Sequence, residues 1–185
     1  MDDWPTEILL DDLRLARIRA NFGIATEIYN IFASDPDGMR FWMPNGTYKS
    51  PEDVFMSYVR RPAWMCMYGI WSGDRFLGEV GFSAISQKHN TAKIGYWLRT
   101  DARGRGIIMR MIARLEQMAF AEHGIEVIYI ECNSKNAVSR HIAEKNGYIL
   151  DGVVRGMYQF ADGSRHDECI YSKLKSEWEK ENKNA

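Results

Sequence analysis

The feature that most constrains this fold is a strand that runs through a glycine- and arginine-rich loop into a long amphipathic helix. Strand and loop read Ile94-Gly95-Tyr96-Trp97-Leu98-Arg99-Thr100-Asp101-Ala102-Arg103-Gly104-Arg105-Gly106-Ile107. From Gly106 to Glu122 the apolar residues fall on one helical stripe, formed by Ile108, Met111, Ile112, Leu115 and Ala119. The opposite side carries Arg110, Arg114 and Gln117. This pattern favours a helix packed on a sheet.

The rest of the chain supplies further strands and helices. Before the loop, strands are predicted at Leu13–Ile18, Ala63–Trp71, Phe76–Ile85 and Thr91–Leu98, with helices at Phe22–Phe32 and after Ser50-Pro51-Glu52-Asp53. After it, strands are predicted at Val127–Cys132, Tyr148–Arg155 and Cys169–Leu174, with a short helix ending at Asn146-Gly147 and a hairpin turn at Asp162-Gly163. The order predicts an α/β (α+β) mixed sheet: an antiparallel meander, one β-α-β crossover, a helix and a C-terminal hairpin. Residues 1–175 are predicted to form one domain and 176–185 a charged, frayed tail.

The loop before the long helix has the composition of a phosphate-binding turn. The first turn of a helix presents unpaired N–H groups and a partial positive charge. Gly104 and Gly106 would let an anion approach the backbone, and Arg99, Arg103 and Arg105 would add charge beside a diphosphate. The alternative is a tight turn with solvated arginines, which two spaced glycines alone would favour.

Two other phosphate-binding motifs fit the loop less well. A dinucleotide fingerprint needs a third glycine where Met109 stands, although Glu131 could act as the ribose-binding acid. That fold also needs two strand–helix–strand halves, and only one is predicted. A Walker loop is excluded because no Gly-Lys-Ser/Thr opens the helix.

The charge balance argues against several classes of partner. Lysine and arginine number 24 and aspartate and glutamate 25, a net charge of −1. General binding to nucleic acid or to an anionic membrane needs a basic excess, so we expect neither. The histidines lie at no metal-ligand spacing, so no metal site is expected.

Several features predict a cytoplasmic location. The acidic N-terminus shows no signal peptide, and the longest apolar run, Pro62–Trp71, is half the length of a membrane helix. Cys66, Cys132 and Cys169 are odd in number and scattered, which suits buried thiols in a reducing compartment.

The motifs resemble those of the GNAT acetyltransferase superfamily. Arg103-Gly104-Arg105-Gly106 after its strand is similar to the acetyl-CoA motif Arg/Gln-x-x-Gly-x-Gly/Ala. Asn136-Ala137-Val138-Ser139 followed by Glu144-Lys145-Asn146-Gly147-Tyr148 resembles the second cofactor segment. Trp42-Met43-Pro44 and the run from Asp162-Gly163 to Asp167 and Tyr171 resemble the RimL/RimJ-like branch of ribosomal-protein N-terminal acetyltransferases. The likeness covers nearly the whole chain.

The resemblance implies an N-acetyltransferase in which a primary amine attacks the thioester of acetyl-CoA directly. It places the cofactor on Trp97, Leu98, Arg99, Arg103, Gly104, Arg105, Gly106, Ile107, Asn136 and Ser139. Pantetheine would pair with a strand edge that splays after Leu98, whose backbone N–H region would stabilise the oxyanion. Ser139 would support the leaving thiolate. From the residues alone, Asn136 would be a helix cap and Ser139 a solvent-facing serine.

The general base stays open between two residues. The position of the branch's acid is occupied by Tyr158, and an ordinary tyrosine pKa near 10 is high for a base at neutral pH. Glu79 is the rival, although a strand glutamate is more often solvated. An α-amine of pKa about 7.7 is neutral in roughly one molecule in six at pH 7, against roughly one in 2,500 for a lysine. A site without a strong base therefore favours an α-amine or another amine of low pKa.

Three departures motivate an alternative function. Ile108 stands where the motif prefers glycine or alanine, Ala143 where many members place an acidic tyrosine, and Lys93 where many carry an acid. Ile108 lies on the apolar stripe and is expected to point into the sheet. The alternative is a non-catalytic acyl-CoA-binding regulatory module. The acceptor stays open between a ribosomal-protein N-terminus, a peptide antibiotic, a polyamine and another small amine, and a homodimer is compatible with the sequence.

Overall fold

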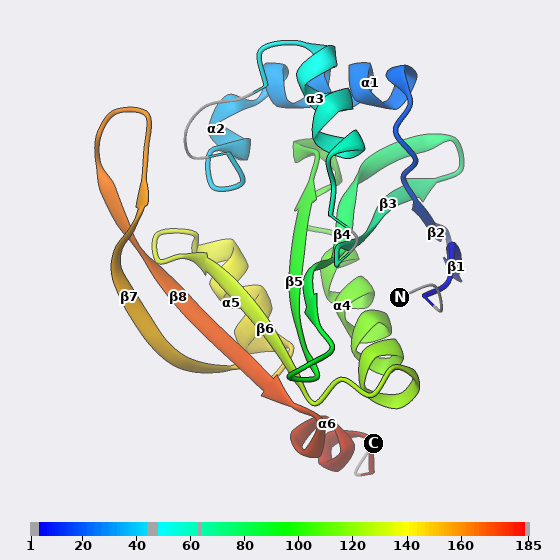
Figure 1. Ribbon diagram of the computed structural model, residues 1–185, viewed down its shortest axis with the longest axis vertical. Helices are drawn as coiled ribbons and strands as arrows, with labels where there is room; N and C mark the ends of the chain where they lie inside the picture. Colours follow the sequence, from blue (N-terminus) through cyan, green and yellow to red (C-terminus); the bar gives the residue numbers. More distant parts are fainter. Residues whose placement is uncertain (1–3, 44–47, 63, 184–185) are drawn as a thin grey trace.

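An eight-stranded mixed sheet forms the centre of the protein (Figure 1). The computed structural model describes residues 4–43, 48–62 and 64–183. The strands are β1 (Glu7–Leu10), β2 (Leu13–Arg17), β3 (Cys66–Ser72), β4 (Arg75–Ser86), β5 (Thr91–Leu98), β6 (Val127–Asn133), β7 (Ile149–Gln159) and β8 (Arg165–Leu174). Their order in the sheet is β1-β2-β3-β4-β5-β6-β8-β7, and β5–β6 is the parallel pair. The meander, the crossover and the hairpin predicted from the sequence are confirmed.

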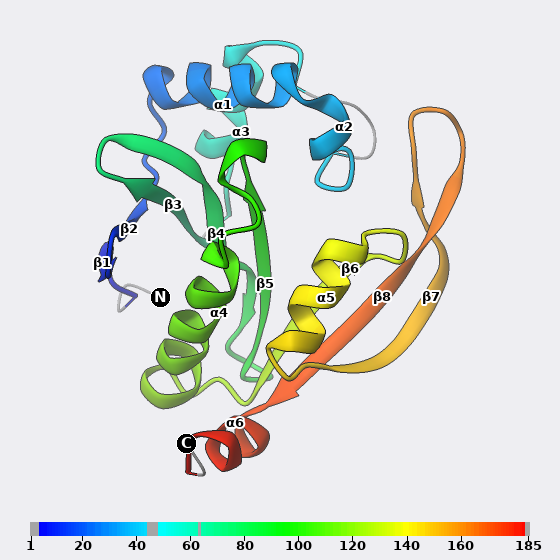
Figure 2. The ribbon, with the colours of Figure 1, turned by 180° about the vertical axis from the view of Figure 1, so that it is seen from behind.

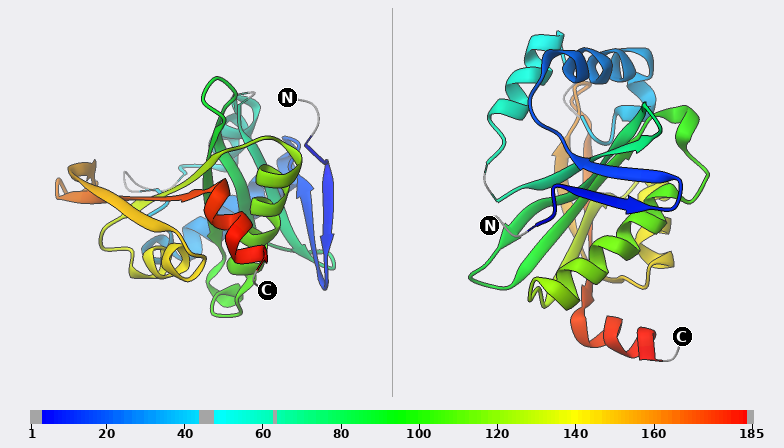
Figure 3. Two further views of the ribbon diagram at one scale, coloured as in Figure 1. Left: turned by 90° about the horizontal axis from the view of Figure 1, so that it is seen from below. Right: turned by 90° about the vertical axis from the view of Figure 1, so that its right-hand side faces the viewer.

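Helices cover both faces of the sheet (Figures 2 and 3). They are α1 (Phe22–Ser34), α2 (Pro36–Met39), α3 (Pro51–Val59), α4 (Ile107–Gln117), α5 (Ala137–Lys145) and α6 (Lys175–Lys183). Trp97 packs with α1 and α3, whereas its neighbour Leu98 packs with α4. Because successive strand residues point to opposite faces, α1 and α3 lie on one face of β5 and α4 on the other.

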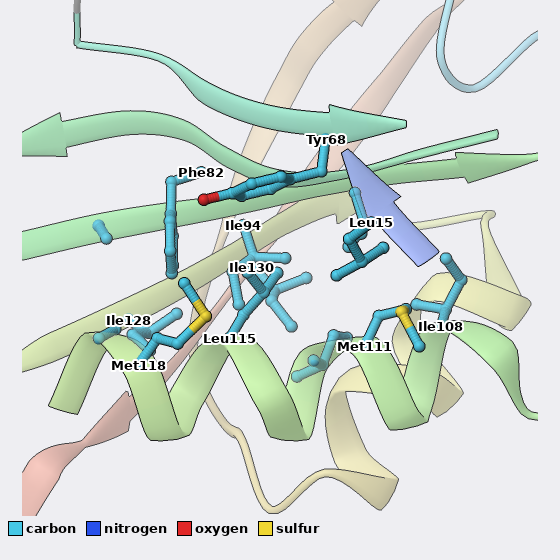
Figure 4. Close-up of a cluster of buried hydrophobic side chains, with 14 of the residues drawn as sticks. Leu15, Tyr68, Phe82, Ile94, Ile108, Met111, Leu115, Met118, Ile128 and Ile130 are labelled. Atoms are coloured by element: carbon cyan, nitrogen blue, oxygen red, sulfur yellow. The ribbon is translucent and has the colours of Figure 1, made fainter. Parts of the chain in front are cut away.

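The main core lies between α4 and the sheet (Figure 4). Ile108, Met111 and Leu115 project from α4 toward the strands, where they face Leu15 and Ile94, and all five are buried. The predicted apolar stripe is therefore confirmed, and so is the inward direction of Ile108. Each such side chain contributes about 1.5–3 kcal/mol of burial free energy, which fixes the start of α4 against β5.

The two ends of the chain differ from the sequence prediction. β1 was missed, because it is a short edge strand that pairs with β2 alone. The tail predicted to be frayed instead forms α6, whose Trp178 packs on Phe120 while Glu181 pairs with the buried Lys173 at 2.6 Å. Expectations for Met1–Asp3, Pro44, Ala63 and residues 184–185 lie outside the described residues.

Two further observations bear on the composition. Cys66, Cys132 and Cys169 are buried free thiols, as the cysteine pattern predicted. Among the helices that the structure describes, none combines the length and the apolar character that crossing a bilayer demands.

Candidate active site

A gap between β5 and β6 positions the site. The two strands pair only from Thr91 to Ile94 on β5. Ser83 of β4 forms a bulge at the same level, and bulges increase local twist. Beyond Ile94, β5 stays paired with β4 and diverges from β6, as Figure 1 shows. The splay predicted after Leu98 therefore begins already after Ile94.

The edge of β5 presents backbone groups to this gap. The Arg99 N–H donates to the Leu77 carbonyl at 2.9 Å, so the backbone groups of Arg99, and by alternation those of Trp97, point toward β4. The N–H and C=O of Leu98 then point into the gap, where the Leu98 carbonyl accepts hydrogen bonds from Arg103 at 2.9 and 3.0 Å. The Leu98 N–H thus stands where an oxyanion or a pantetheine amide can accept from it.

A cavity of about 560 Å³ occupies the gap. Its walls come from α2 and the turn after it, the edge of β5, the start of α4, the end of β6, the first half of α5 and Tyr158. Cys132 of β6 faces the α4 side, and its neighbour Glu131 faces the other side, yet both line the cavity. Because residues on both faces contribute, the cavity connects the two faces of the sheet.

The start of α4 has the features of an anion cradle. Gly104 and Gly106 adopt left-handed backbone conformations, with φ of +74° and +68°. A Cβ added at either position would meet nothing within 4 Å, so a ligand can reach the backbone there. Within the described part of the chain no side chain caps the helix, and Gly104, Gly106 and Ile107 line the cavity. The uncapped amides and the positive helix end fit a diphosphate.

The three arginines of the loop do not form the expected cluster. Arg103 lines the cavity, but its guanidinium is engaged by the Leu98 and Gly38 carbonyls and thereby ties the loop to α2. Arg99 bonds Asp101 at 2.8 Å, and Arg105 bonds the Asp101 carbonyl at 3.1 Å. Neither lines the cavity. The start of α4, more than the arginine side chains, therefore faces the cavity.

The start of α5 forms the wall opposite α4. The Asn136 side-chain oxygen accepts from the Ser139 N–H at 3.1 Å, so Asn136 caps α5 while lining the cavity. Ser139 is buried rather than solvent-facing, and its hydroxyl lies 2.8 Å from that of Tyr96. Burial raises the pKa of Tyr96, so it stays protonated and orients Ser139. Sequence reasoning missed Tyr96, because its approach to Ser139 depends on how α5 packs against β5.

The two candidate bases sit in different environments. Glu79 is buried, with its carboxylate bonded to Arg61 at 2.9 and 3.1 Å and to the Trp97 indole N–H at 3.0 Å. The expectation of a solvated outer-face residue is wrong, and Glu79 does not line the cavity. Tyr158 does line it, but burial and the nearby Glu168 carboxylate raise its pKa. A phenolate base at Tyr158 is therefore disfavoured.

The three departures from the superfamily motif have separate structural explanations. Ile108 is a core residue, and Ala143 is fully buried between α5 and the sheet. Lys93 pairs with Glu131 at 2.9 Å beside the cavity. From the sequence, Glu131 is expected only as a ribose-binding acid. Strand alternation places it on the face opposite α4, where Trp42 also packs, and Phe41 and Trp42 line the cavity from the turn after α2.

Comparison with solved structures places cofactor complexes in the same fold. RimL, a ribosomal L7/L12 alpha-N-protein acetyltransferase, has been solved with coenzyme A and superposes with a TM-score of 0.76 at 20% identity, covering 92% of this chain and 96% of that chain. The microcin C7 self immunity acetyltransferase MccE, solved with acetyl-CoA and AMP, gives a TM-score of 0.75 at 23% identity, covering 89% and 93%.

The sequence comparisons add the family. The ribosomal-protein-serine acetyltransferase of Escherichia coli (strain K12) is 29% identical over 128 residues, which span 69% of this chain and 70% of that protein. Residues 13–149 match the acetyltransferase (GNAT) domain family. This match extends from β2 to the start of β7 and includes the gap, the anion cradle and the cap of α5. The chain therefore belongs to the GNAT acetyltransferase family, and it is an N-acetyltransferase.

Proposed function

We propose that this enzyme transfers the acetyl group of acetyl-CoA directly to the α-amine of a peptide or protein N-terminus, in the cytoplasm. The observation that carries the proposal is the cavity that crosses the sheet at the β5–β6 gap. The anion cradle lies on one side of it, and Tyr158 and Trp42 lie at its other end. Cofactor and acceptor can thus approach one point from opposite faces.

The chain's own groups account for cofactor binding. Acetyl-CoA, when bound, supplies the acetyl thioester. The amides of Gly104, Gly106 and Ile107 hold its diphosphate, and the edge of β5 at Tyr96, whose backbone groups face the gap by the same alternation as those of Leu98, holds its pantetheine arm by main-chain hydrogen bonds. Arg103 positions the loop through its bonds to the Leu98 carbonyl. Arg99 and Arg105 are left out of this site.

Direct attack is favoured over an acetyl-cysteine intermediate. Cys132 is the thiol that lines the cavity within the described residues, and burial raises its pKa to about 11. At pH 7 such a thiol is ionised in roughly one molecule in 10,000, and the thiolate is the nucleophilic form. The acceptor amine is therefore the nucleophile, and the Leu98 N–H stabilises the oxyanion that forms on the thioester carbonyl.

The protonation state of the acceptor favours an α-amine. Among the titratable groups that line the described cavity, Tyr158 is held protonated, Glu131 is paired with Lys93, and Asp37 and His141 are solvent-exposed, so no buried, unpaired base stands beside the acceptor. The acceptor must therefore arrive neutral, which an α-amine does far more often than a lysine. A relative named for acetylating a ribosomal protein supports a protein acceptor.

We expect the purified enzyme to acetylate a peptide with a free N-terminus at least about 10-fold faster, in kcat/KM at pH 7, than the same peptide with a blocked N-terminus and one lysine, because the α-amine is neutral far more often. Thiol release from acetyl-CoA measures both rates. A preference for the lysine peptide would contradict the proposed acceptor. Polyamines and small amines, assayed in parallel, identify a small-molecule acceptor if the peptides fail.

The alternative of a regulatory binding module makes a different prediction. It requires tight acetyl-CoA binding by calorimetry together with no thiol release on any amine. Family membership and a cavity open to both faces of the sheet support the enzyme.

Ser139→Ala is expected to lower kcat about 10-fold while changing acetyl-CoA affinity less than about 2-fold. The hydroxyl stabilises charge that develops only on the departing sulfur, so its removal affects the transition state more than the bound cofactor. Tyr96→Phe is the matched control: it keeps the Ser139 hydroxyl but removes the partner 2.8 Å away, so a smaller loss of kcat is expected. A Ser139→Ala enzyme with unchanged kcat would remove Ser139 from the mechanism.

A further inference from the structure

Tyr158 is aimed at the cavity by a bulge in β7. Val154 pairs with Glu168 and Tyr158 with His166, so residues 155–157 of β7 stand opposite one residue of β8. The Gly156 N–H holds this bulge by donating to the Asp167 carboxylate at 2.8 Å. Bulges beside active sites commonly redirect a side chain. Here the Tyr158 ring reaches the cavity, and its hydroxyl turns back toward β8.

The Tyr158 hydroxyl donates a short hydrogen bond to a buried carboxylate. The distance from the Tyr158 oxygen to Oε1 of Glu168 is 2.5 Å. Glu168 is only 7% exposed and is not among the described residues that line the cavity. Cys169, its neighbour on β8, packs into the α4 core, so Glu168 points to the opposite face, where the acceptor enters. Tyr158 therefore stands between Glu168 and the cavity.

Neither residue alone suits proton removal at the thioester. Tyr158 contacts the cavity but is held protonated, because burial and the Glu168 and Glu131 carboxylates raise its pKa. Glu168 can accept a proton but lies behind the tyrosine. A tyrosine hydroxyl can both donate and accept, so it can pass one proton on while receiving another.

We propose that Tyr158 and Glu168 form a proton relay in which Glu168 receives, through the Tyr158 hydroxyl, the proton that the acceptor amine loses. This inference rests on the proposed direct transfer. The neutral amine forms the N–C bond, and its nitrogen becomes a cationic and therefore acidic group. That nitrogen gives a proton to the Tyr158 oxygen as the Tyr158 proton moves to Glu168. The C–S bond then breaks, the thiolate leaves toward Ser139 and takes a proton from solvent, and Glu168 returns its own to solvent.

A carboxylate is sufficient for this step. A carboxylate could not deprotonate a lysine ammonium before the attack. The cationic nitrogen of the tetrahedral adduct is more acidic, so a weak base can accept its proton. Tyr158 touches the reacting nitrogen and is the catalytic residue of the pair. Glu168 acts through it and is a positioning residue that also stores the proton.

Other charged groups lie near Tyr158 and Glu168, and their effects on the pH profile of kcat have to be distinguished from the effect of this pair. Glu131 of β6 faces the same space and pairs with Lys93 of β5 at 2.9 Å. The His166 ring contacts the Asn133 side chain at 3.1 Å and the Lys135 ammonium at 3.0 Å. His166→Gln is therefore included as a control, since a titration that it abolishes belongs to the imidazole.

The test uses Glu168→Gln, Tyr158→Phe and the double variant of the full chain. Glutamine keeps an oxygen that can accept from Tyr158 but cannot take up its proton. Each single variant is expected to lower kcat about 30-fold at pH 7. General base catalysis typically contributes at least roughly 100-fold, and the expected loss is somewhat smaller because water can replace part of the relay. Acetyl-CoA affinity by calorimetry should change less than about 2-fold, because neither side chain lies at the cradle. The losses should shrink above pH 9, where hydroxide removes the proton.

The double variant discriminates a relay from two independent effects. Residues that act as one unit are strongly non-additive, so the double loss should stay near 30-fold instead of approaching roughly 900-fold. Glu116→Gln supplies a matched control, because Glu116 is also buried but pairs with Lys173 away from the cavity. It should leave the pH profile of kcat unchanged even if it alters thermal stability.

The outcomes distinguish failure of the relay from failure of the proposed function. Losses below 3-fold, multiplicative losses, or losses independent of pH would overturn the relay while wild-type turnover on the N-terminal peptide keeps the proposed function. If the wild-type enzyme turns over another amine instead, the proposed acceptor fails and the same variants test the relay with that amine. A wild-type enzyme that binds acetyl-CoA but acetylates no amine would overturn both.

Discussion

Gly106→Asp is expected to weaken acetyl-CoA binding on the order of 100-fold, whereas Gly106→Asn should weaken it less than about 10-fold. Gly106 opens α4 with φ of +68°, and an added Cβ meets no atom of the described residues within 4 Å. Asparagine and aspartate are the side chains that enter this conformation most readily, so both variants carry similar strain. They differ by one negative charge at the proposed diphosphate site. At about 5 Å and an effective dielectric constant of about 20, that charge costs roughly 3 kcal/mol.

Calorimetric titration of both variants with acetyl-CoA measures the difference, and thermal unfolding checks that the two have equal stability. The difference in acetyl-CoA affinity between the two variants should narrow when the salt concentration is raised about tenfold, from about 0.05 M to about 0.5 M, because salt screens exposed charges. Equal affinities for Gly106→Asp and Gly106→Asn would mean that the diphosphate does not lie at the start of α4. The cofactor would then have to enter the cavity from another wall.

The sequence predicts the elements well because their signals are local. Period-two alternation and turn residues bound β5 at Thr91–Leu98, and Ser50 caps α3 through the Asp53 N–H as its position before Pro51 suggested. The apolar stripe of α4 is visible without knowing what covers it. β1 and α6 were missed because a short edge strand and a charged helix carry weak local patterns, and their order depends on contacts with β2 and Phe120.

The site is less predictable, because its contacts join distant segments. The hydroxyls of Tyr96 and Ser139 meet only once α5 has packed against β5. Tyr158 meets Glu168 only because a bulge shifts the register of β7. Arg103 looked like a phosphate ligand in the motif, but the backbone turns its guanidinium onto the Leu98 carbonyl. Residue type and spacing predict the glycine turn that opens α4, whereas the groups proposed to transfer the proton come together only in the tertiary structure.

Glu79 illustrates the same limit and leads to the second large effect. A glutamate in the middle of a strand looks solvent-facing or catalytic, yet its carboxylate is 3% exposed and ion-paired with Arg61, which is 22% exposed. The Arg61 guanidinium also stacks over the Tyr58 ring at 3.7 Å. Arg61 lies just beyond α3, far from Glu79 in sequence, so no local pattern could reveal the pair. Through the Trp97 indole, the pair anchors the strand that borders the cavity.

Arg61→Met is expected to lower the free energy of unfolding by about 4 kcal/mol, because it leaves the Glu79 carboxylate buried without its cation. The double variant Arg61→Met/Glu79→Met removes both charges and should recover most of that loss, since apolar replacement of a buried ion pair is often close to neutral. Denaturant unfolding of the wild type, both single variants and the double variant gives the coupling free energy between the two side chains. A double variant no more stable than Arg61→Met would show that the ion pair is not the source of the loss.

The same double variant separates a structural Glu79 from a catalytic one. If Glu79 only anchors Trp97, the double variant should keep kcat within about 3-fold of the wild type once it is folded, because no proton passes through Glu79. If Glu79 were the base, kcat would fall on the order of 100-fold at pH 7 even in this stable background. Measuring kcat and stability on one protein prevents a folding defect from being mistaken for a lost base. Retained activity would leave Tyr158 and Glu168 as the groups that accept the proton of the amine.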